Sequence, residues 1–202
     1  MREQKMRARG WHKRIVTTDS RHGYEAAGNI LNRDFHAPRP GEKWVSDISY
    51  LMTGGGRLYL TVILDLFDRK VIGWSMAEDL SARGVCRALA MAAGSRPARE
   101  GLIFHSDRGV QYCSGEFCNE LNRLCPSVRR SMSRKGNCRD NACAESFFKT
   151  LKTELDLSER RYSAKQVKSL VFEYIEMYYN RRRRHSALGY AIPVALTNNF
   201  VA

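Results

Sequence analysis

Residues 43–77 read KWVSDISYLMTGGGRLYLTVILDLFDRKVIGWSMA and contain the strongest strand signals of the chain. Three runs rich in β-branched and aromatic residues, each separated from the next by a short turn, lie at 43–52, 58–67 and 71–77. Connections this short join neighbouring antiparallel strands. The almost unbroken apolar run at 58–67 is typical of a strand that is covered on both faces. We therefore expect a three-stranded antiparallel meander.

Helical and strand-like stretches alternate downstream of this meander. Helix-forming composition marks 81–93, 114–124 and 142–155, and short strands are expected at 101–106 and 127–132. A helix between two strands favours a parallel crossover. The order of elements therefore predicts an α/β fold, a mixed five-stranded sheet with helices on both faces.

The clearest amphipathic helix follows, with apolar residues at Val167, Leu170, Val171, Tyr174, Ile175 and Tyr178. This spacing places them on one face of a helix, which we expect to pack on the core. Tyr178 and Tyr179 are expected on the core-facing side and its border. At the start of the helix over 142–155, Asp140 or Asn141 is the expected cap.

The net charge of +13 is unevenly distributed along the chain. Residues 1–43 carry ten basic and five acidic residues, 44–128 carry nine of each, and 129–202 carry fifteen basic and seven acidic. A neutral body between two basic flanks is typical of a protein that grips a polyanion. Solubility alone is the other interpretation of the charge.

The rest of the composition excludes several classes of protein. No apolar run approaches the roughly 20 residues of a membrane span, and the basic N-terminus lacks the apolar part of a signal peptide. A cytoplasmic location without a membrane partner is therefore expected. The six cysteines show no CxxC pair and no histidine at zinc-finger spacing, which favours reduced thiols over a zinc site.

Three acidic residues stand out by their positions. Asp47 lies in the middle of an expected strand, where aspartate is disfavoured. Asp107 follows the strand at 101–106, and Glu145 lies near the start of a helix. Each has an ordinary interpretation alone, Asp107 as a turn residue and Glu145 as a solvated one. Together, carboxylates about 4 Å apart repel by roughly 4 kcal/mol, so a cluster would take up protons or bind Mg²⁺ or Mn²⁺.

Five strings, in this order, carry a resemblance to a known family: WVSDISY, YLTVILDLFDRKVIGW, HSDRGVQY, SMSRKGNCRDNACAESFFKTLKTE and YNRRRRHSALGYAIP. The chain from about residue 44 to residue 193 resembles the catalytic domain of bacterial insertion-sequence transposases. This is the second-reading-frame (OrfB) product, which has a retroviral-integrase-like core. The resemblance implies a ribonuclease-H-like fold and a DDE triad, which falls on Asp47, Asp107 and Glu145. These residues would be catalytic and would hold two Mg²⁺ or Mn²⁺ ions.

The resemblance also implies an activity and partners. Such a chain nicks DNA at the ends of its element and joins the 3′-hydroxyl to a new phosphodiester by transesterification. The implied partners are double-stranded DNA of the element ends and target, further copies of the chain on DNA, and a separate helix-turn-helix protein or fusion from the first reading frame. On DNA the protein would be nucleoid-associated. The expected organisation is 1–43 as a basic segment and linker, 44–160 as the integrase-like core, and 161–202 as an amphipathic helix with a basic tail.

Basic residues around the triad are candidate DNA contacts. Lys149 and Lys152 fall on the same helical face as Glu145. The other candidates are Arg134 and Lys135 in the preceding loop, and the run Arg181, Arg182, Arg183 and Arg184. Phosphate contacts of this kind position DNA without reading its sequence. An ordinary solvated surface is the alternative for all of them, and His105 is expected to be structural.

Two departures from the family pattern leave other functions open. Between Asp107 and Glu145 lie 37 residues, about two more than is usual, with the surplus near Cys125 and Pro126. No helix-turn-helix is evident in residues 1–43. A non-catalytic DNA-binding regulator derived from a transposase is one alternative. A ribonuclease-H-like nuclease that cuts RNA–DNA hybrids without joining strands is another. Convergence of the three carboxylates would favour the transposase.

Overall fold

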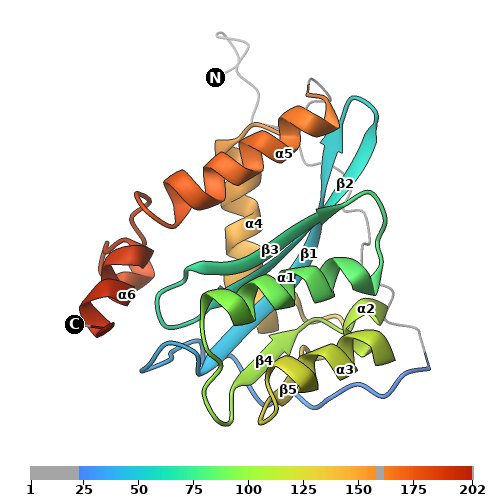
Figure 1. Cartoon of the computed structure of the whole chain (residues 1–202), viewed down its shortest axis with the longest axis vertical. Coiled ribbons are helices and arrows are strands. Elements are labelled where there is room, and N and C mark those ends of the chain that lie inside the picture. Colours follow the sequence, from blue (N-terminus) through green and yellow to red (C-terminus); the bar gives the residue numbers. More distant parts are fainter. Residues whose placement is uncertain (1–22, 158–161, 202) are drawn as a thin grey trace, which may run out of the picture.

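The structure is a computed structural model that describes residues 23–157 and 162–201 of the chain. A single mixed sheet is flanked by helices (Figure 1). The strands are β1 (Lys43–Thr53), β2 (Gly56–Asp65), β3 (Val71–Ala77), β4 (Ile103–Ser106) and β5 (Arg129–Met132). The α-helices are α1 (Ala82–Ser95), α2 (Val110–Cys113), α3 (Gly115–Leu124), α4 (Ala142–Glu154), α5 (Ala164–Phe172) and α6 (Pro193–Val201).

The strand order in the sheet is β3-β2-β1-β4-β5. The pairs β1–β2 and β2–β3 are antiparallel, whereas β4 is parallel to both β1 and β5. The predicted meander and the predicted crossover through α1 to a parallel fourth strand are both confirmed. The fifth strand lies at the sheet edge, as expected.

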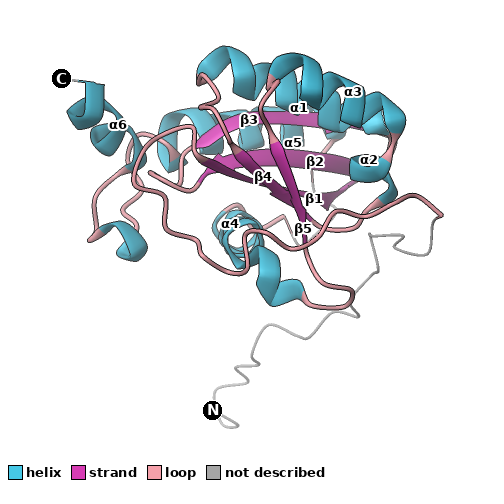
Figure 2. Cartoon of the chain, turned by 90° about the horizontal axis from the view of Figure 1, so that it is seen from below, coloured by secondary structure: helices cyan, strands magenta, loops and turns pink. Residues whose placement is uncertain are grey.

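Each face of the sheet has its own apolar core, because successive side chains of a strand point to opposite faces. Trp44 packs with α1, α2 and α3, and the next residue, Val45, packs with α4 and α5. Figure 2 shows α4 on one side of the sheet and α1 with α3 on the other. The predicted α/β sheet with helices on both faces is therefore confirmed. Among the described helices, none has the length and apolar character that a membrane crossing requires.

The amphipathic helix near the C-terminus changes its pitch. Beyond α5, residues Glu173–Tyr179 form a π-helical turn, in which the N–H of Asn180 bonds to the carbonyl of Ile175 at 3.1 Å. A π-helical turn contains more residues than an α-helical turn, so the core-facing position moves along the chain. Tyr179 is 3% exposed and Tyr178 is 43% exposed. The expectation of Tyr178 on the core face is therefore wrong, and Tyr179 takes that place.

The segments outside residues 44–160 also pack on the sheet. Leu31 and Ala37 join the apolar cluster under α4 and α5. The N–H groups of Ile30 and Leu31 both donate to Ser131 Oγ of β5, at 2.9 Å. The predicted boundary at residue 160 falls within 158–161, outside the described residues. The division into 1–43, 44–160 and 161–202 stays a prediction.

Gly73 marks the closest approach of a helix to the sheet. A Cβ at this position would lie 2.2 Å from the Ala88 carbonyl oxygen and 2.7 Å from Ala92 Cβ, so α1 would have to move. We expect Gly73→Ala to lower the free energy of unfolding by about 3 kcal/mol, measured by urea titration. Gly94→Ala is the control, because a Cβ there would meet nothing within 4 Å. Equal unfolding midpoints for both variants would contradict this account.

Candidate active site

The sheet divides at the point where two of the predicted acids lie. The parallel strands β1 and β4 pair only from Lys43–Ile103 to Val45–His105. Asp47 lies two residues beyond the last pair, and Asp107 directly follows the end of β4. Carboxyl ends of strands in open sheets are where ligand sites form. The topology therefore places both carboxylates at the point where β1 continues past the end of β4.

Glu145 comes to this place from α4, which packs on the face of β1 that carries Asp47. Val45 and Leu51 share that face with Asp47, because alternate residues of a strand point the same way. Both belong to the same apolar cluster as the buried side of α4, which consists of Ala144, Phe147, Phe148 and Leu151. Glu145 lies in the first turn of this helix and is half-buried. The packing of α4 therefore orients Glu145 toward β1.

The pKa of Asp47 is affected by the charges of the other two acids. Burial is the largest cause that raises its pKa well above the usual value, and the charges of Asp107 and Glu145 raise it further. The hydrogen bond from the Ile48 N–H and the charge of Lys152 oppose this rise. Like charges disfavour ionisation at short range. The charges of Asp107 and Glu145 therefore both act on the Asp47 carboxylate.

Backbone hydrogen bonds hold the two aspartates in place. Asp47 Oδ1 accepts from the Ile48 N–H at 2.8 Å, and Asp107 Oδ1 accepts from the Gly109 N–H at 2.9 Å. Within residues 23–157 and 162–201, no three His, Cys, Asp or Glu side chains are arranged closely enough to hold a metal ion. The acids therefore adjoin one another without forming an assembled ligand set.

A buried tyrosine that the sequence did not single out lies under the strand beside Asp47, on the opposite face of the sheet. Tyr112 of α2 is fully buried, and its hydroxyl lies 2.7 Å from Ser46 Oγ. Because Ser46 donates its only hydroxyl hydrogen to the Val62 carbonyl, Tyr112 is the donor to Ser46. Burial raises the pKa of Tyr112 well above 10, and Asp107 and Asp47 raise it further. Tyr112 is therefore neutral, and it could have been noticed only through its place three residues after Gly109.

His105, in the strand that ends before Asp107, has a structural role, as expected. Its Nδ1 lies 2.9 Å from Ser131 Oγ, and its Nε2 lies 3.1 Å from Ser133 Oγ. Burial lowers the pKa of His105 to about 4, while the charge of Asp140 opposes the shift. A neutral imidazole with both nitrogens engaged joins β4 to β5.

The two candidate lysines of α4 differ in their surroundings. Lys149 is exposed. Lys152 is half-buried, its Nζ donates to Ser49 Oγ at 2.6 Å, and it lies 4.8 Å from the centre of the Tyr50 ring. Burial lowers the pKa of Lys152, and the charge of Asp47 opposes this effect. Lys152 is therefore tied to β1 beside the acids, whereas Lys149 faces solvent.

The loop before α4 holds Arg134 in a salt bridge. Asp140, which is fully buried, accepts from Arg134 Nε at 2.9 Å and from Nη2 at 2.8 Å. Arg33 Nε donates to the same carboxylate at 2.8 Å. Lys135 is exposed in this loop. Assignment of Arg134 and Lys135 as DNA contacts stays a prediction, and Arg134 already has a carboxylate partner.

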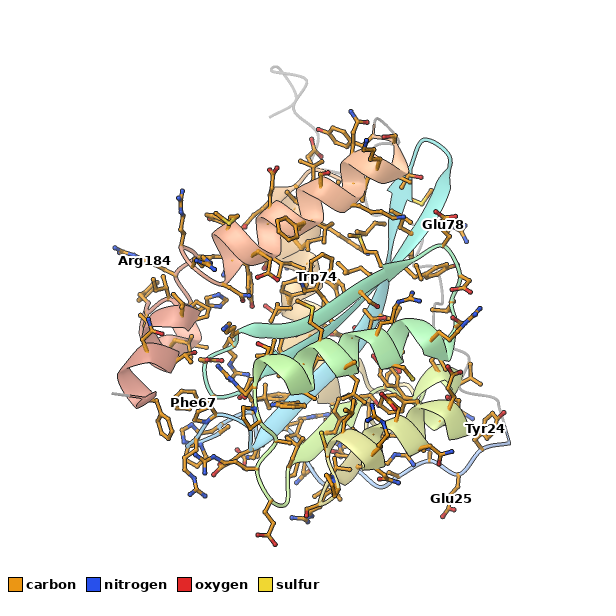
Figure 3. The ribbon with its side chains drawn as sticks, in the orientation of Figure 1. Tyr24, Glu25, Phe67, Trp74, Glu78 and Arg184 are labelled. Atoms are coloured by element: carbon orange, nitrogen blue, oxygen red, sulfur yellow. The ribbon has the colours of Figure 1, made fainter. Side chains whose placement is uncertain are left out.

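The run of four arginines follows the π-helical turn. Arg183 pairs with Glu154 at 3.2 Å and lies 5.9 Å from the centre of the Tyr179 ring. The remaining three are exposed: Arg181, Arg182 and Arg184. Figure 3 shows Arg184 projecting outward at the end of the molecule that carries α6. Their role as DNA contacts also stays a prediction.

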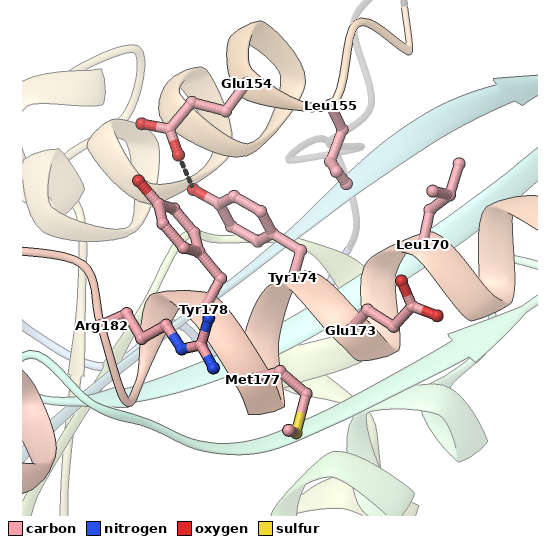
Figure 4. Close-up of a pocket in the computed structure, with 8 residues that line it drawn as sticks. All are labelled: Glu154, Leu155, Leu170, Glu173, Tyr174, Met177, Tyr178 and Arg182. Carbon is pink, nitrogen blue, oxygen red and sulfur yellow. Dashed lines mark hydrogen bonds between the residues drawn. The ribbon is translucent and has the colours of Figure 1, made fainter.

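A surface cavity of about 520 Å³ lies away from the three acids, between α4, α5 and the π-helical turn (Figure 4). Its lining residues are Glu154, Leu155, Leu170, Glu173, Tyr174, Met177, Tyr178 and Arg182. The Tyr174 hydroxyl donates to Glu154 Oε2 at 2.8 Å across its wall. Since none of the three acids lines this cavity, it is separate from the candidate active site.

The surplus residues between Asp107 and Glu145 form a turn before β5. The N–H of Cys125 donates to the Leu121 carbonyl at 2.8 Å, and Val128 N–H donates to the Cys125 carbonyl at 3.0 Å. After this turn, β5 pairs in parallel with the whole of β4. The turn at residues 125–128 therefore precedes β5 and leaves its pairing with β4 uninterrupted.

Solved structures that resemble this chain include retroviral integrases. The catalytic core domain of the integrase of HTLV-2, in complex with magnesium, matches with a TM-score of 0.55 over 74% of this chain and 92% of its own, at 15% identity. The simian T-cell lymphotropic virus intasome, in complex with PP2A regulatory subunit B56 gamma, matches with a TM-score of 0.62, at 16% identity. That match covers 83% of this chain and 56% of the other. The predicted ribonuclease-H-like fold is confirmed.

Proteins with similar sequences are encoded by bacterial insertion sequences. Two models of the integrase core domain match residues 37–138 and 127–193. Transposase InsF for insertion sequence IS3A of Escherichia coli (strain K12) is 44% identical over 202 residues, which are all of this chain and 69% of that protein. The insertion element IS600 uncharacterized 31 kDa protein of Shigella sonnei is 40% identical over 200 residues, 98% of this chain and 72% of the other. This chain therefore belongs to the insertion-sequence transposases that are built on an integrase core domain.

Proposed function

We propose that this chain nicks DNA at the ends of an insertion element and joins the freed 3′-hydroxyl to target DNA by transesterification. As a transposase catalytic domain it is a polynucleotidyl transferase of the DDE type. The catalytic residues in this proposal are Asp47, Asp107 and Glu145. The observation that supports it is the position of these acids: Asp47 and Asp107 lie just beyond the last pair between β1 and β4, and α4, whose first turn carries Glu145, packs on the face of β1 that carries Asp47.

The acids also suit divalent cations. All three offer carboxylate oxygens, which Mg²⁺ and Mn²⁺ prefer. Burial is the largest cause of the raised pKa of Asp47, and the charges of Asp107 and Glu145 add to the rise, which a bound cation would offset. Two such ions, when bound, would activate the attacking hydroxyl and stabilise the leaving oxygen. The magnesium in the HTLV-2 integrase core supports the same class of ion for this chain.

The chain's own basic groups would hold the DNA. Lys149 faces solvent one turn after Glu145, so it is suited to contact a phosphate near the reacting bond. Lys152 lies deeper and would keep part of the acid cluster's charge balanced. Double-stranded DNA is thus the substrate, and joining two ends of an element favours a homo-oligomer on DNA. The helix-turn-helix partner from the first reading frame also remains part of the proposal.

Strand joining is the activity that tests this proposal. The chain is incubated with labelled duplexes that carry the two ends of its element, with Mg²⁺ or Mn²⁺, and the products are separated by length. We expect strands cut at the 3′ ends and longer strands that contain joined target DNA. Binding of the ends without any cutting would instead favour the non-catalytic regulator. Cleavage of RNA–DNA hybrids without joining would favour the nuclease.

Phosphate contact by Lys149 predicts a change in salt dependence. The affinity of a protein for duplex DNA falls with salt in proportion to the number of phosphates that it neutralises. We expect Lys149→Gln to weaken binding of any duplex and to reduce the slope of log Kd against log salt by about 1, measured by fluorescence anisotropy. Arg87→Gln is the control of equal charge, because Arg87 is exposed on α1 across the sheet. An equal change in slope for the two variants would argue against contact at Lys149.

A further inference from the structure

The residue before α4 does not act as a helix cap. Asn141 occupies the cap position, where an asparagine side chain usually accepts from an N–H of the first turn. Its side chain makes no such bond. Instead, Asn141 Nδ2 donates to the Ser46 carbonyl of β1 at 2.9 Å, and Asn141 is only 4% exposed. The expectation of a cap from Asp140 or Asn141 is therefore wrong, because both side chains bond to distant parts of the chain.

The Ser46 carbonyl needs this partner because the sheet divides here. The Lys43 carbonyl accepts from Leu66 N–H on the β2 side, so alternate residues of β1 direct their backbone groups toward β4. Ser46 and Ile48 are among the residues whose backbone groups point toward the β4 side. The pairing with β4 ends at Val45, so these groups have no partner on a strand there. Two side chains replace the missing strand, since Asn141 donates to the Ser46 carbonyl and Asp47 accepts from Ile48 N–H.

The orientation of the amide follows from its partner. A carbonyl oxygen can only accept, so the nitrogen of Asn141 must face Ser46. The other atom, Asn141 Oδ1, is buried and has no hydrogen-bond partner. Burial of an unpaired acceptor costs about 1–3 kcal/mol. The Asn141 amide therefore makes one hydrogen bond, to the Ser46 carbonyl, and leaves its oxygen unpaired at a cost to stability.

The position of Asn141 in the chain relates this bond to Glu145. Asn141 immediately precedes α4, and Glu145 lies in the first turn of this helix. Asn141 reaches Ser46, and Glu145 influences the next residue of β1, Asp47. Further along α4, Lys152 bonds to Ser49 of the same strand. The face of α4 that carries Glu145 is thus fastened to β1 on both sides of the glutamate.

We propose that Asn141 is a positioning residue, whose amide fixes the start of α4 against β1 so that the Glu145 carboxylate faces Asp47. The proposal rests on the proposed catalytic role of Glu145 and deepens it. Asn141 contacts neither DNA nor ion in this role. Its amide takes the place of a β4 backbone N–H as the partner of the Ser46 carbonyl, and this bond holds the start of α4 at a fixed distance from β1.

The test compares Asn141→Ala with Asn141→Asp, which keeps the shape of the side chain but presents an acceptor to the Ser46 carbonyl. For both variants we expect kcat of strand joining to fall at least about tenfold, with KM for DNA unchanged within about twofold. Mn²⁺ binding to the DNA-free chain, measured by calorimetry, should weaken at least about fivefold. Thermal unfolding midpoints should stay close to wild type for Asn141→Ala, because the variant leaves the Ser46 carbonyl unpaired but removes the equally unpaired Asn141 Oδ1. Asn119→Ala, at an exposed position on α3, is the control.

A double-mutant cycle separates positioning from a general loss of structure. In a Glu145→Gln background, Asn141→Ala or Asn141→Asp should weaken Mn²⁺ binding no further, because both changes act through the same carboxylate. Additive losses would overturn the positioning role, and so would wild-type kcat and Mn²⁺ affinity in the single variants. If Glu145→Gln alone left joining and Mn²⁺ binding intact, the proposed function would fail instead. The two failures are therefore distinguishable.

Discussion

Replacing Asp107 by asparagine should reduce DNA nicking and strand joining on the order of 10³-fold or more. Asparagine keeps the size of the side chain and one oxygen, but it removes the charge that would hold a divalent cation. Loss of metal-assisted stabilisation of a phosphoryl transition state is worth several kcal/mol, and each 1.36 kcal/mol is roughly tenfold in rate. DNA binding should persist, because the candidate phosphate contacts lie on other residues.

The Asp107→Asn prediction also has a readout that is independent of activity. The charge of Asp107 raises the pKa of Asp47, so its removal relieves repulsion in the metal-free chain. The thermal midpoint without metal should therefore not decrease. Asp79→Asn, at an exposed carboxylate before α1, is the matched control and should join strands normally. Cutting by Asp107→Asn at the wild-type rate with Mg²⁺ would exclude Asp107 from the triad.

Replacing Arg96 by alanine should cause the largest loss of stability. The Arg96 guanidinium bonds to both oxygens of Asp68, at 3.0 and 2.7 Å, and pairs with Asp65 at 2.9 Å. Both aspartates are fully buried, and Arg96 is 5% exposed. Its removal would leave two buried carboxylates without their cation. Breaking a buried pair in this way costs about 3–5 kcal/mol.

Urea unfolding at several pH values measures this effect. Burial raises the pKa of Asp65, and Arg96 is the main cause that opposes the rise. Without Arg96 the pKa of Asp65 should rise further, so the carboxyl takes up a proton more readily when folded. The destabilisation should therefore be larger at pH 8 than at pH 5. Arg87→Ala, exposed on the same helix, is the control, and an equally small effect of both variants would contradict the buried network.

Most of the sheet could be predicted from the sequence, because its signals are local. Short turns between β-branched runs specify the meander of β1, β2 and β3, and the apolar run of β2 reflects burial on both faces. The acids Asp47 and Asp107 were noticeable because a carboxylate in or after a buried strand is unusual. Glu145 was noticeable from its place near a helix start, but a single acid there is ordinary, and the resemblance to the family was needed to assign it to the triad.

Other features depend on contacts between residues far apart in the chain, so no local pattern predicts them. The bond from Asn141 to Ser46 spans 95 residues, and no local pattern separates this asparagine from a helix cap. Likewise, Arg134 resembles a free basic residue until Asp140 is seen to hold it. The π-helical turn that moves Tyr179 into the core is set by packing, which overrides the regular period of the sequence. By itself, then, the sequence determined the strands, the family and the acids, whereas the gap between β1 and β4, and the side chains that fill it, required the folded chain.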